Sequence, residues 1–265
     1  MKVRFRKRLG WALVALTVLG GIWGSIQPLP YVILSPGPAF NVLGIADGRE
    51  VLQVLPPVDS EPPGEIHLLT VSELGSPESS PNFWDLVLAF LSEDQAIYPM
   101  DLFFPNGETV DKLNANGKKQ FDQSKAASLA AASMVLPIGT LDEHRVKFDV
   151  ADVGGPSGGM MFALGIYDKL TPGQLTGGHD IAGTGTIDGA GVVGPIGGIQ
   201  QKMFGAKNAG AKFFLAPAEN CSEVVGHIPA GLRVFKVTNF KDALTAVEEI
   251  GAGDDLSALP TCTTK

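Results

Sequence analysis

The sequence predicts an α/β (α+β) fold. In the second half of the chain, stretches with the pattern of helices alternate with short apolar stretches typical of strands, and short connections join them. Hydrophobic residues make up 45% and charged residues 18% of the 265 residues, as expected of a globular protein with a large core. The 33 glycines and 19 prolines indicate many turns rather than disorder, because apolar blocks persist along the whole chain.

The most regular pattern lies after residue 145. The stretch 157–170 is apolar on nearly all sides, so we expect a helix there at the centre of the domain. The other expected elements of this half are helices at 198–209, 217–225 and 240–250, and strands at 145–150, 180–193 (with a turn), 212–215 and 232–237.

The first half is less regular. Residues 30–43 indicate a strand broken by a turn, because Pro and Gly interrupt its short apolar runs. The remaining expected elements are strands at 50–55 and 65–71, an apolar helix at 83–90, a loop at 99–117 and an Ala-rich, closely packed helix at 123–135.

Residues 9–27 have the properties of a membrane-spanning signal anchor. The stretch 9–26 carries no charge and would be about 27 Å long as a helix, close to the thickness of the hydrocarbon core of a bilayer. Five basic residues precede it and no acid occurs before Asp47, so the positive-inside rule places residues 1–8 in the cytoplasm and the body outside. A cleaved signal peptide is the alternative, although its best cleavage site, Ile22-Trp23-Gly24, begins with a bulky residue.

The charge distribution argues against nucleic-acid binding. The formal net charge is −8, and without the five N-terminal bases the other 15 basic residues face 28 acids, so the remainder carries −13. An acidic body without a basic stripe does not suit a phosphate backbone.

Cys221 and Cys262 are the only two cysteines. Outside the cytoplasm a disulfide between them is allowed, and it would tie the C-terminal tail to the body. We favour this pairing because a free exposed thiol is a liability in an oxidising compartment; the alternative is one buried thiol and one exposed thiol in the tail.

The stretch Gly154-Gly155-Pro156-Ser157-Gly158-Gly159 places one hydroxyl among glycines, directly before an apolar run. It predicts a tight turn that opens a buried helix, with Ser157 beside free backbone N–H groups and the positive end of the helix dipole. Such a place suits a serine nucleophile with an oxyanion hole. It suits equally a serine that caps the helix.

A nucleophilic serine needs a base, and the residues offer two candidates. His179 is the nearest histidine downstream, but the stretch Gly177-Gly178-His179-Asp180 indicates an exposed turn. Lys202 lies one turn into a helix that a second glycine turn opens, between apolar neighbours that could lower its pKa. A lysine on an amphipathic helix is, by itself, more often solvated than catalytic.

No cofactor or metal is expected. The chain has no GxxxxGK[ST] stretch, so an ATPase has no support, and 183–189 does not fit GxGxxG. The four histidines (His67, His144, His179 and His227) are scattered, without an HExxH or CxxC pattern, which argues against a metal site.

The stretches GGPSGGMMFAL and AGTGTIDGAGVVGPIGGIQQK together resemble the proteolytic domain of Lon proteases. The pattern is similar to that of the membrane-anchored, Lon-like bacterial proteases that usually also carry a PDZ domain. The resemblance covers residues 146–250, and YVILSPGPA (31–39) and the N-terminal segment are also similar to this group.

This resemblance implies a serine–lysine dyad, in which Ser157 matches the nucleophile and Lys202 the general base. Thr184 falls on a threonine that would orient the lysine. The glycine turn (Gly155, Pro156 and Gly158 around the serine) would supply the oxyanion hole.

The chain departs from the family in four respects. Gly158 stands where alanine is common, which we take as conservative. Gly154 and Thr186 stand where the cytosolic enzymes carry acids, so an acidic third member of the site is not expected. The PDZ domain has no place, because only ten residues (136–145) lie between the Ala-rich helix and the next strand. No ATPase module is present.

The resulting division is a basic cytoplasmic tail (1–8), a transmembrane anchor (9–27), an N-terminal part of the ectodomain without PDZ (28–145), a Lon-like core (146–250) and a polar tail (251–265). The resemblance implies an ATP-independent serine endopeptidase at the bacterial cell membrane that cleaves exported or membrane-associated proteins. By analogy it would be a homo-oligomer, a hexamer. The alternative is a non-catalytic scaffold or binding protein with the same fold.

Overall fold

The computed structural model describes residues 2–46, 48–56, 64–137, 139–150, 153–171 and 175–263; up to residue 25 it describes only the side chains of 11, 14–21 and 23–25. The chain divides into two compact units. The first contains Met1–Ser35 and Glu73–Val110, and the second contains Pro36–Ser72 and Asp111–Lys265.

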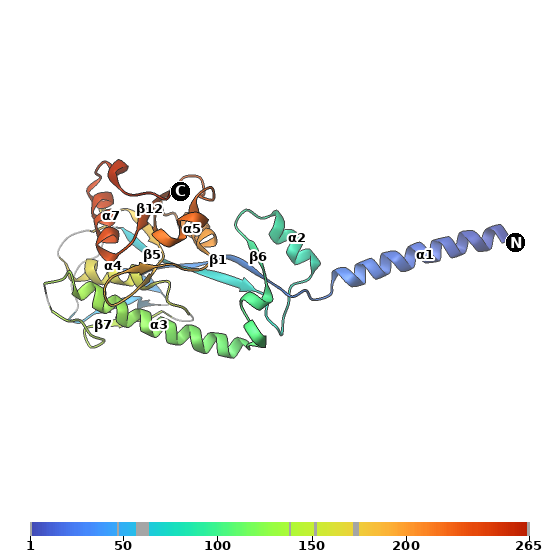
Figure 1. The fold of residues 1–265 in the computed structure, drawn as a ribbon, viewed down its shortest axis with the longest axis horizontal. Coiled ribbons are helices and arrows are strands. Elements are labelled where there is room, and N and C mark those ends of the chain that lie inside the picture. The colour runs from blue at the N-terminus through green and yellow to red at the C-terminus, as the bar shows by residue number, and fades with distance from the viewer. Residues whose placement is uncertain are drawn as a thin grey trace. The chain divides into compact units, whose positions relative to one another are not determined.

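The first unit begins with helix α1 (Lys2–Ser25), at the blue end of the ribbon in Figure 1. Among the residues that the structure describes, no helix combines the length and the apolarity needed to cross a membrane. The structure therefore does not support the membrane-spanning segment predicted at 9–27. Part of that segment, the side chains of 9, 10, 12, 13 and 22, lies outside the described residues.

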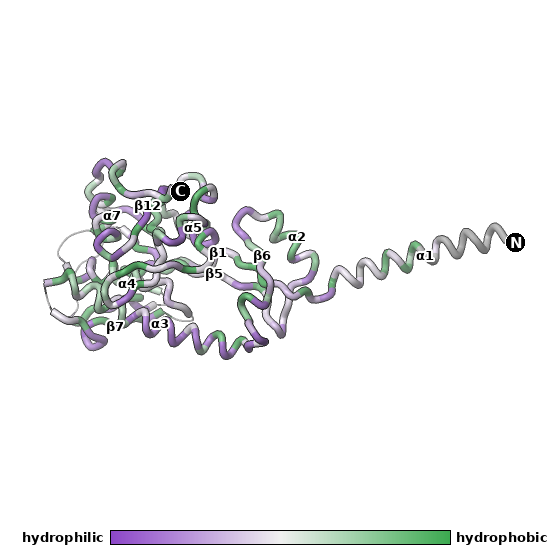
Figure 2. The backbone as a smooth tube through the Cα atoms, viewed as in Figure 1, coloured by the Kyte–Doolittle hydropathy of each residue, from purple (hydrophilic) through white to green (hydrophobic). Residues whose placement is uncertain are grey.

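Helix α2 (Phe83–Leu91) confirms the helix predicted at 83–90. Asn82 caps it: its side chain accepts hydrogen bonds from the backbone N–H groups of Trp84 and Asp85, and Asp85 Oδ2 accepts one from the N–H of Asn82. Figure 2 shows α2 as largely hydrophobic. Several of its large apolar side chains are nevertheless exposed: Phe83, Trp84, Leu88, Phe90 and Leu91.

The rest of the first unit contains β6 (Ala96–Pro99), the short 3-10 turns η1 (Met100–Leu102) and η2 (Pro105–Gly107), and the first residues of β1 (Tyr31–Asn41). β6 pairs antiparallel with Tyr31–Leu34 of β1.

Helix α3 (Val110–Ser133) is much longer than the predicted helix at 123–135, so the predicted loop at 99–117 is wrong from residue 110 onward. Asn114, Asn116 and Gly117 are poor helix formers, which hid this part of the helix in the sequence. A tertiary contact holds it, because the Gly117 carbonyl accepts a hydrogen bond from the N–H of Gly155 at 2.9 Å.

The main sheet has the strand order β12-β11-β8-β5-β1-β6. In the second unit β12 (Arg233–Val237), β11 (Phe213–Pro217), β8 (Asp180–Gly183) and β5 (Glu65–Leu74) run parallel, and the register sets Ile181 opposite both Phe213 and Ile66. Parallel strands joined through helices are the α/β arrangement that the sequence predicted.

Alternate residues of these strands face two different helix layers. Ile66, Leu68, Ile181, Leu215 and Phe235 pack in one core with α4 (Gly159–Leu170) and α7 (Phe240–Ala252). Leu69, Ala182, Phe214 and Val234 pack in the other core with α5 (Ile199–Asn208) and α6 (Cys221–Val224). The prediction of a central helix is confirmed, because Met160–Leu164 of α4 are fully buried.

Strand β1 is continuous, so the turn predicted within residues 30–43 is wrong. Pro36 and Pro38 are tolerated because β6 pairs only with residues 31–34, which leaves the following residues of β1 at a free edge where no N–H is needed. Gly37 is required there, since a Cβ would overlap Thr70 of β5.

Three short antiparallel pairs complete the second unit: β4 (Leu52–Val54) with β7 (Val146–Phe148), β9 (Thr186–Ile187) with β10 (Val193–Gly194), and β2 (Ile45–Ala46) with β3 (Arg49–Glu50). The predicted strand and turn at 180–193 thus divide into β8, β9 and β10. The predicted helix at 217–225 divides into the 3-10 turn η3 (Ala218–Asn220) and α6.

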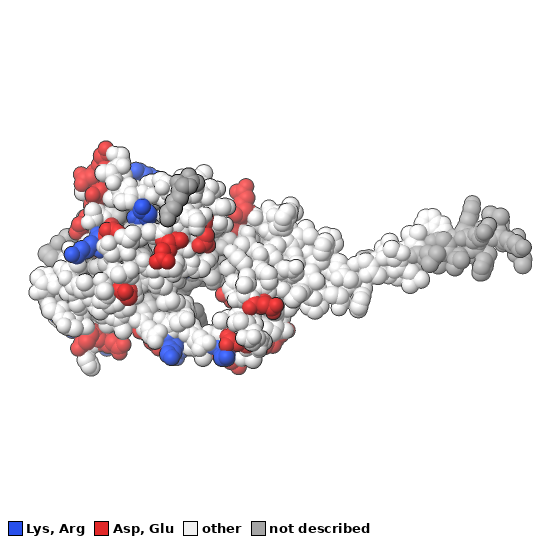
Figure 3. Space-filling view, in the orientation of Figure 1, with Lys and Arg blue, Asp and Glu red and all other residues white. Residues whose placement is uncertain are grey.

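The tail after α7 packs against the body. Cys221 and Cys262 form a disulfide, Leu256 of η4 (Leu256–Ala258) and Leu259 are buried, and the Pro260 carbonyl accepts a hydrogen bond from the N–H of Lys236. The predicted polar tail at 251–265 is therefore a docked segment. Figure 3 shows acidic and few basic side chains on the surface in view.

Candidate active site

The serine turn precedes the central helix. Gly155 has φ +83°, a conformation that favours glycine, and α4 begins only at Gly159. Gly158 is the capping residue, and no side chain caps the helix. The capping alternative for Ser157 is therefore wrong. The Ser157 side chain is partly exposed, which leaves it accessible to a substrate.

Helix α3 supports the turn from one side. The Ser124 hydroxyl donates a hydrogen bond to the Pro156 carbonyl at 3.1 Å, and Gly117 accepts from Gly155. A Cβ at Gly159 would lie 2.7 Å from Ser124 Oγ, so the close approach of α3 requires glycine there. Nothing in the sequence indicates this role for Ser124, because its partner lies in a turn that is distant along the chain.

The strand end after β8 supports the turn from the other side. The Ser157 carbonyl accepts two hydrogen bonds, from the Gly185 N–H at 2.8 Å and from the Thr184 hydroxyl at 3.1 Å. The Met160 N–H in turn donates to the Gly185 carbonyl at 3.2 Å. These contacts fix the backbone of Ser157 and leave its hydroxyl free to bond elsewhere.

Lys202 lies in the first turn of α5, as predicted. Gly198 precedes the helix with φ 69°, and its carbonyl accepts the Lys202 N–H at 3.0 Å. The loop before it is held by the buried Asn220, whose side-chain oxygen accepts from the Ile196 N–H and whose amide donates to the Ile196 carbonyl. The sequence did not point to Asn220.

The structure brings Ser157, Lys202 and Thr184 together. Lys202 Nζ lies 2.6 Å from Ser157 Oγ and 3.2 Å from Thr184 Oγ1. The lysine side chain is only 3% exposed and Thr184 is fully buried. Two hydroxyl groups therefore surround an amine that has little access to water.

Burial lowers the pKa of Lys202 from its ordinary value to about 7. No carboxylate contributes to this shift among the described residues. Gly154 and Thr186 occupy the positions at which the family resemblance would place acids in the cytosolic enzymes. A large fraction of the lysine is therefore neutral near pH 7 and can accept the proton of the neighbouring hydroxyl.

Two backbone N–H groups are available for an oxyanion. Within the described part of the chain, the amides of Ser157 and Gly158 have no hydrogen-bond acceptor. They lie just before the first turn of α4, where the helix dipole favours negative charge. These are the features that an oxyanion hole needs.

Gly158 is more constrained than the sequence suggested. A Cβ at this position would overlap Cδ1 of the buried Leu68 on β5. The interpretation of Gly158 as a conservative replacement for alanine holds only if the Leu68 side chain moves.

His179, the alternative base, is not part of this group. Its ring packs edge-on against Phe213, with the ring centroids 5.4 Å apart. No hydrogen bond joins it to Ser157 among the described residues.

A serine before the central helix with a dry lysine at hydrogen-bond distance is the arrangement of nucleophile and base that serine peptidases of the serine–lysine class use. Residues 146–249 match the Lon protease (S16) C-terminal proteolytic domain. This matching region contains Ser157, Thr184 and Lys202.

Lon proteases are similar to part of this chain. Lon protease 1 of Sorangium cellulosum is 29% identical over 149 residues (54% of this chain, 18% of the relative), and Lon protease of Desulforamulus reducens is 34% identical over 141 residues (52% and 17%). Lon protease of Campylobacter concisus is 37% identical over 94 residues (34% and 11%). The chain spans less than a fifth of the length of these relatives.

Proposed function

We propose that this protein is an ATP-independent serine endopeptidase in which Ser157 is the nucleophile and Lys202 the general base. The observation that carries the proposal is the 2.6 Å contact between Ser157 Oγ and the buried Lys202 Nζ. The pKa of Lys202 near 7 gives the base the protonation state that it needs.

The reaction uses only groups of this chain and water. Neutral Lys202 takes the proton of Ser157 Oγ, and the oxygen attacks the carbonyl carbon of the peptide bond. The N–H groups of Ser157 and Gly158 stabilise the oxyanion that forms. The lysine ammonium then protonates the leaving amine, and a water molecule deprotonated by Lys202 hydrolyses the acyl-enzyme.

Thr184 positions the base. Its hydroxyl accepts a hydrogen bond from Lys202 Nζ and donates one to the Ser157 carbonyl, so a single side chain fixes the amine relative to the nucleophile. This geometry supports the role that the family resemblance implies for Thr184, which is to orient the lysine.

We also propose that the protein is anchored in the bacterial cell membrane, with the catalytic domain outside the cytoplasm. The uncharged stretch 9–26 behind five basic residues supports this, and the Cys221–Cys262 disulfide suits an oxidising compartment. Exported or membrane-associated proteins are the substrates that such a location offers. Protease treatment of intact spheroplasts should remove a C-terminal tag but not an N-terminal one; protection of both tags would contradict this orientation.

Assembly as a homo-oligomer, a hexamer by analogy with ring-forming Lon domains, belongs to the same proposal. Light scattering of the purified full chain in detergent measures it directly. A monomer at working concentration would remove the oligomer from the proposal and leave the dyad chemistry in place.

The decisive experiment is turnover of a fluorescently labelled unfolded protein by the full chain without ATP. The unaltered protein should cleave it, whereas Ser157→Ala and Lys202→Ala should not. Ser222→Ala, an exposed serine of α6, is the matched control. Equal cleavage by all four proteins would contradict the dyad, and no cleavage by any, with the fold intact, would favour the non-catalytic scaffold.

A further inference from the structure

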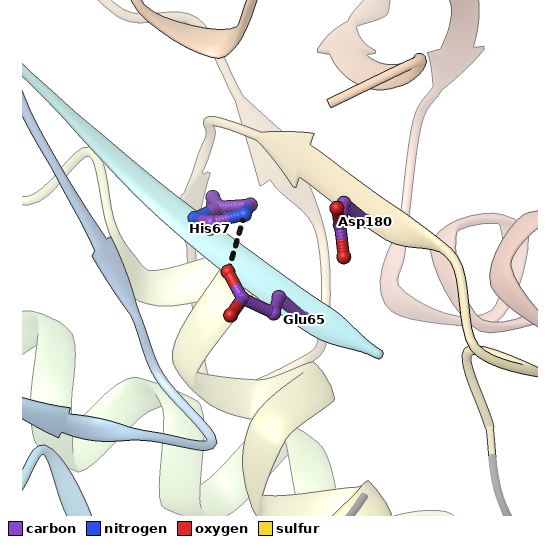
Figure 4. A group of neighbouring side chains, drawn as sticks. All are labelled: Glu65, His67 and Asp180. Carbon is purple, nitrogen blue, oxygen red and sulfur yellow. Dashed lines mark ion pairs between the residues drawn. The ribbon is translucent and has the colours of Figure 1, made fainter. Parts of the chain in front are cut away.

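A second group of chemically active side chains lies on the same sheet at the start of two parallel strands. Glu65 and His67 are two residues apart on β5, so their side chains leave the same face. The strand register pairs Glu65 with Asp180 on β8. Figure 4 shows the three side chains gathered over the two strands.

His67 is the buried member of this group, which we call the strand-start cluster (Glu65, His67 and Asp180). It is 5% exposed, and neither ring nitrogen has a hydrogen-bond partner among the described residues. Its Nε2 lies 3.0 Å from Glu65 Oε2 (Figure 4), but the two atoms are not aligned as a hydrogen bond. An unsatisfied buried imidazole is costly, so a missing partner explains the site better than the ion pair alone.

The spacing of the cluster fits coordination of a cation. One ligand atom from each of the three residues lies within 4.8 Å of the other two. Ligands that are each roughly 2.0–2.2 Å from a common metal ion are roughly 3.0–3.5 Å apart, and the Nε2 to Oε2 distance falls at the short end of that range. Coordination by all three ligand atoms requires that those separated by more than this range move closer together.

The charges of the strand-start cluster also favour a bound cation. The carboxylates of Glu65 and Asp180 act electrostatically on the imidazole of His67. Two carboxylates then leave an excess of negative charge beside an imidazole lone pair. Both carboxylates are accessible to solvent, and Glu65 is 48% exposed at its side chain, which gives an ion a path to the site.

We propose that Glu65, His67 and Asp180 bind a divalent transition-metal cation, for which Zn²⁺ is the best match. One imidazole and two carboxylates are a ligand set that Zn²⁺ accepts, with water in the remaining position, whereas Mg²⁺ and Ca²⁺ favour oxygen ligands alone. The ion would join the first residues of β5 and β8.

The role of this ion is structural. Asp180 and Thr184 lie on the same face, four residues apart along β8, so the cluster is about 13 Å from the dyad along the strand. No group of the dyad reaches that far. The metal site is therefore independent of the proposed peptidase chemistry, and each can fail without the other.

Zinc titration of the chelator-treated full chain, followed by calorimetry, tests the proposal. We expect one equivalent of Zn²⁺ per chain. Glu65→Gln and Asp180→Asn should each weaken the affinity at least tenfold while keeping the size of the side chain. Asp254→Asn, an exposed acid outside the cluster, is the matched control and should change it less than twofold.

A second measurement covers the case in which a variant binds poorly because it folds poorly. The thermal midpoint of each metal-free variant should lie close to that of the metal-free parent, and only the parent and the Asp254→Asn control should gain stability on adding Zn²⁺. No binding by the parent, or equal binding by the parent and both cluster variants, would overturn the proposal.

Discussion

Two buried bases lie on the same face of the sheet, Lys202 over the ends of the strands and His67 near their beginnings. Both are almost fully removed from water, and burial lowers the pKa of each, that of Lys202 to about 7. They differ in their neighbours. Lys202 contacts two hydroxyls with good hydrogen-bond distances, whereas His67 contacts two carboxylates and has no hydrogen bond.

Burial lowers the pKa of both basic side chains, but it does not determine the chemistry of either site. A hydroxyl beside a neutral amine offers a proton, and the pair can activate a nucleophile. Carboxylates beside a neutral imidazole offer no proton, but they offer charge to a cation. The chemistry of each site therefore follows from the first neighbours of the base.

The largest expected effect is on the nucleophile. Ser157→Ala removes the only oxygen that Lys202 can activate at 2.6 Å, so kcat should fall by roughly 10⁴-fold or more. Cleavage of a fluorogenic peptide measures it, with Ser222→Ala as the control. A loss below tenfold would contradict the assignment of Ser157 as the nucleophile, and with it the proposed difference in chemistry between the sites of Lys202 and His67.

Replacing the base should uncouple activity from stability. Lys202→Met should abolish cleavage and yet stabilise the fold by roughly 1–4 kcal/mol at or below pH 7, because a buried amine is costly when charged. The unfolded lysine titrates near 10.5 and the folded one near 7, so the penalty shrinks by about 1.4 kcal/mol per pH unit across that range. The gain should therefore fade as the pH rises.

Chemical denaturation at pH 6, 7.5 and 9 measures this gain. Lys207→Met, which removes an exposed lysine on the same helix, serves as the control. A gain that does not depend on pH would mean that desolvation of Lys202 is not its cause. The rate of the parent enzyme should rise between pH 6 and 8 and then level off, as the amine loses its proton.

Thr184 should have an intermediate effect. Thr184→Val keeps the shape but removes the hydroxyl that holds Lys202 and the Ser157 carbonyl, so kcat should fall by roughly 10- to 100-fold. Thr184→Ser should recover much of the loss. If valine and serine variants have the same kcat, the residue contributes packing alone.

The smallest effect concerns the other base. In the metal-free protein His67→Leu should change the free energy of unfolding by no more than about 1 kcal/mol, because the ring nitrogens have no partner to lose. With Zn²⁺ present, the same change should remove the metal-dependent rise in thermal midpoint that the parent shows. Cleavage of the peptide should be equal in both proteins, which separates the two sites.

The dyad could be predicted from the sequence because its members lie in short, recognisable glycine turns. The residues alone left a helix cap and His179 as alternatives, and only the resemblance to Lon proteolytic domains implied the roles of Ser157, Thr184 and Lys202. The structure places Lys202 Nζ within 3.2 Å of both hydroxyl oxygens. The predicted order of helices and strands after residue 145 also agrees with α4 to α7, with shifts of a few residues at their ends.

What the sequence could not show depends on contacts between distant segments. Asn220 holds the loop before the lysine helix, and Ser124 holds the serine turn, but each looks like an ordinary polar residue in its own segment. His67 was set aside because no other metal ligand follows it at a familiar spacing. Its partner Asp180 arrives only through the pairing of β5 with β8.

The disulfide near the proposed site can form only after the C-terminal tail has been synthesised, and only in an oxidising compartment. Cys221 follows directly on Asn220, the residue that fixes the loop before Lys202, and its partner Cys262 lies beyond β12 and α7. A newly made chain can acquire this brace only after Cys262 has been synthesised and oxidised. If the domain is exported as we propose, the segment that holds Asn220 acquires its covalent link to the C-terminal tail only after it reaches an oxidising compartment.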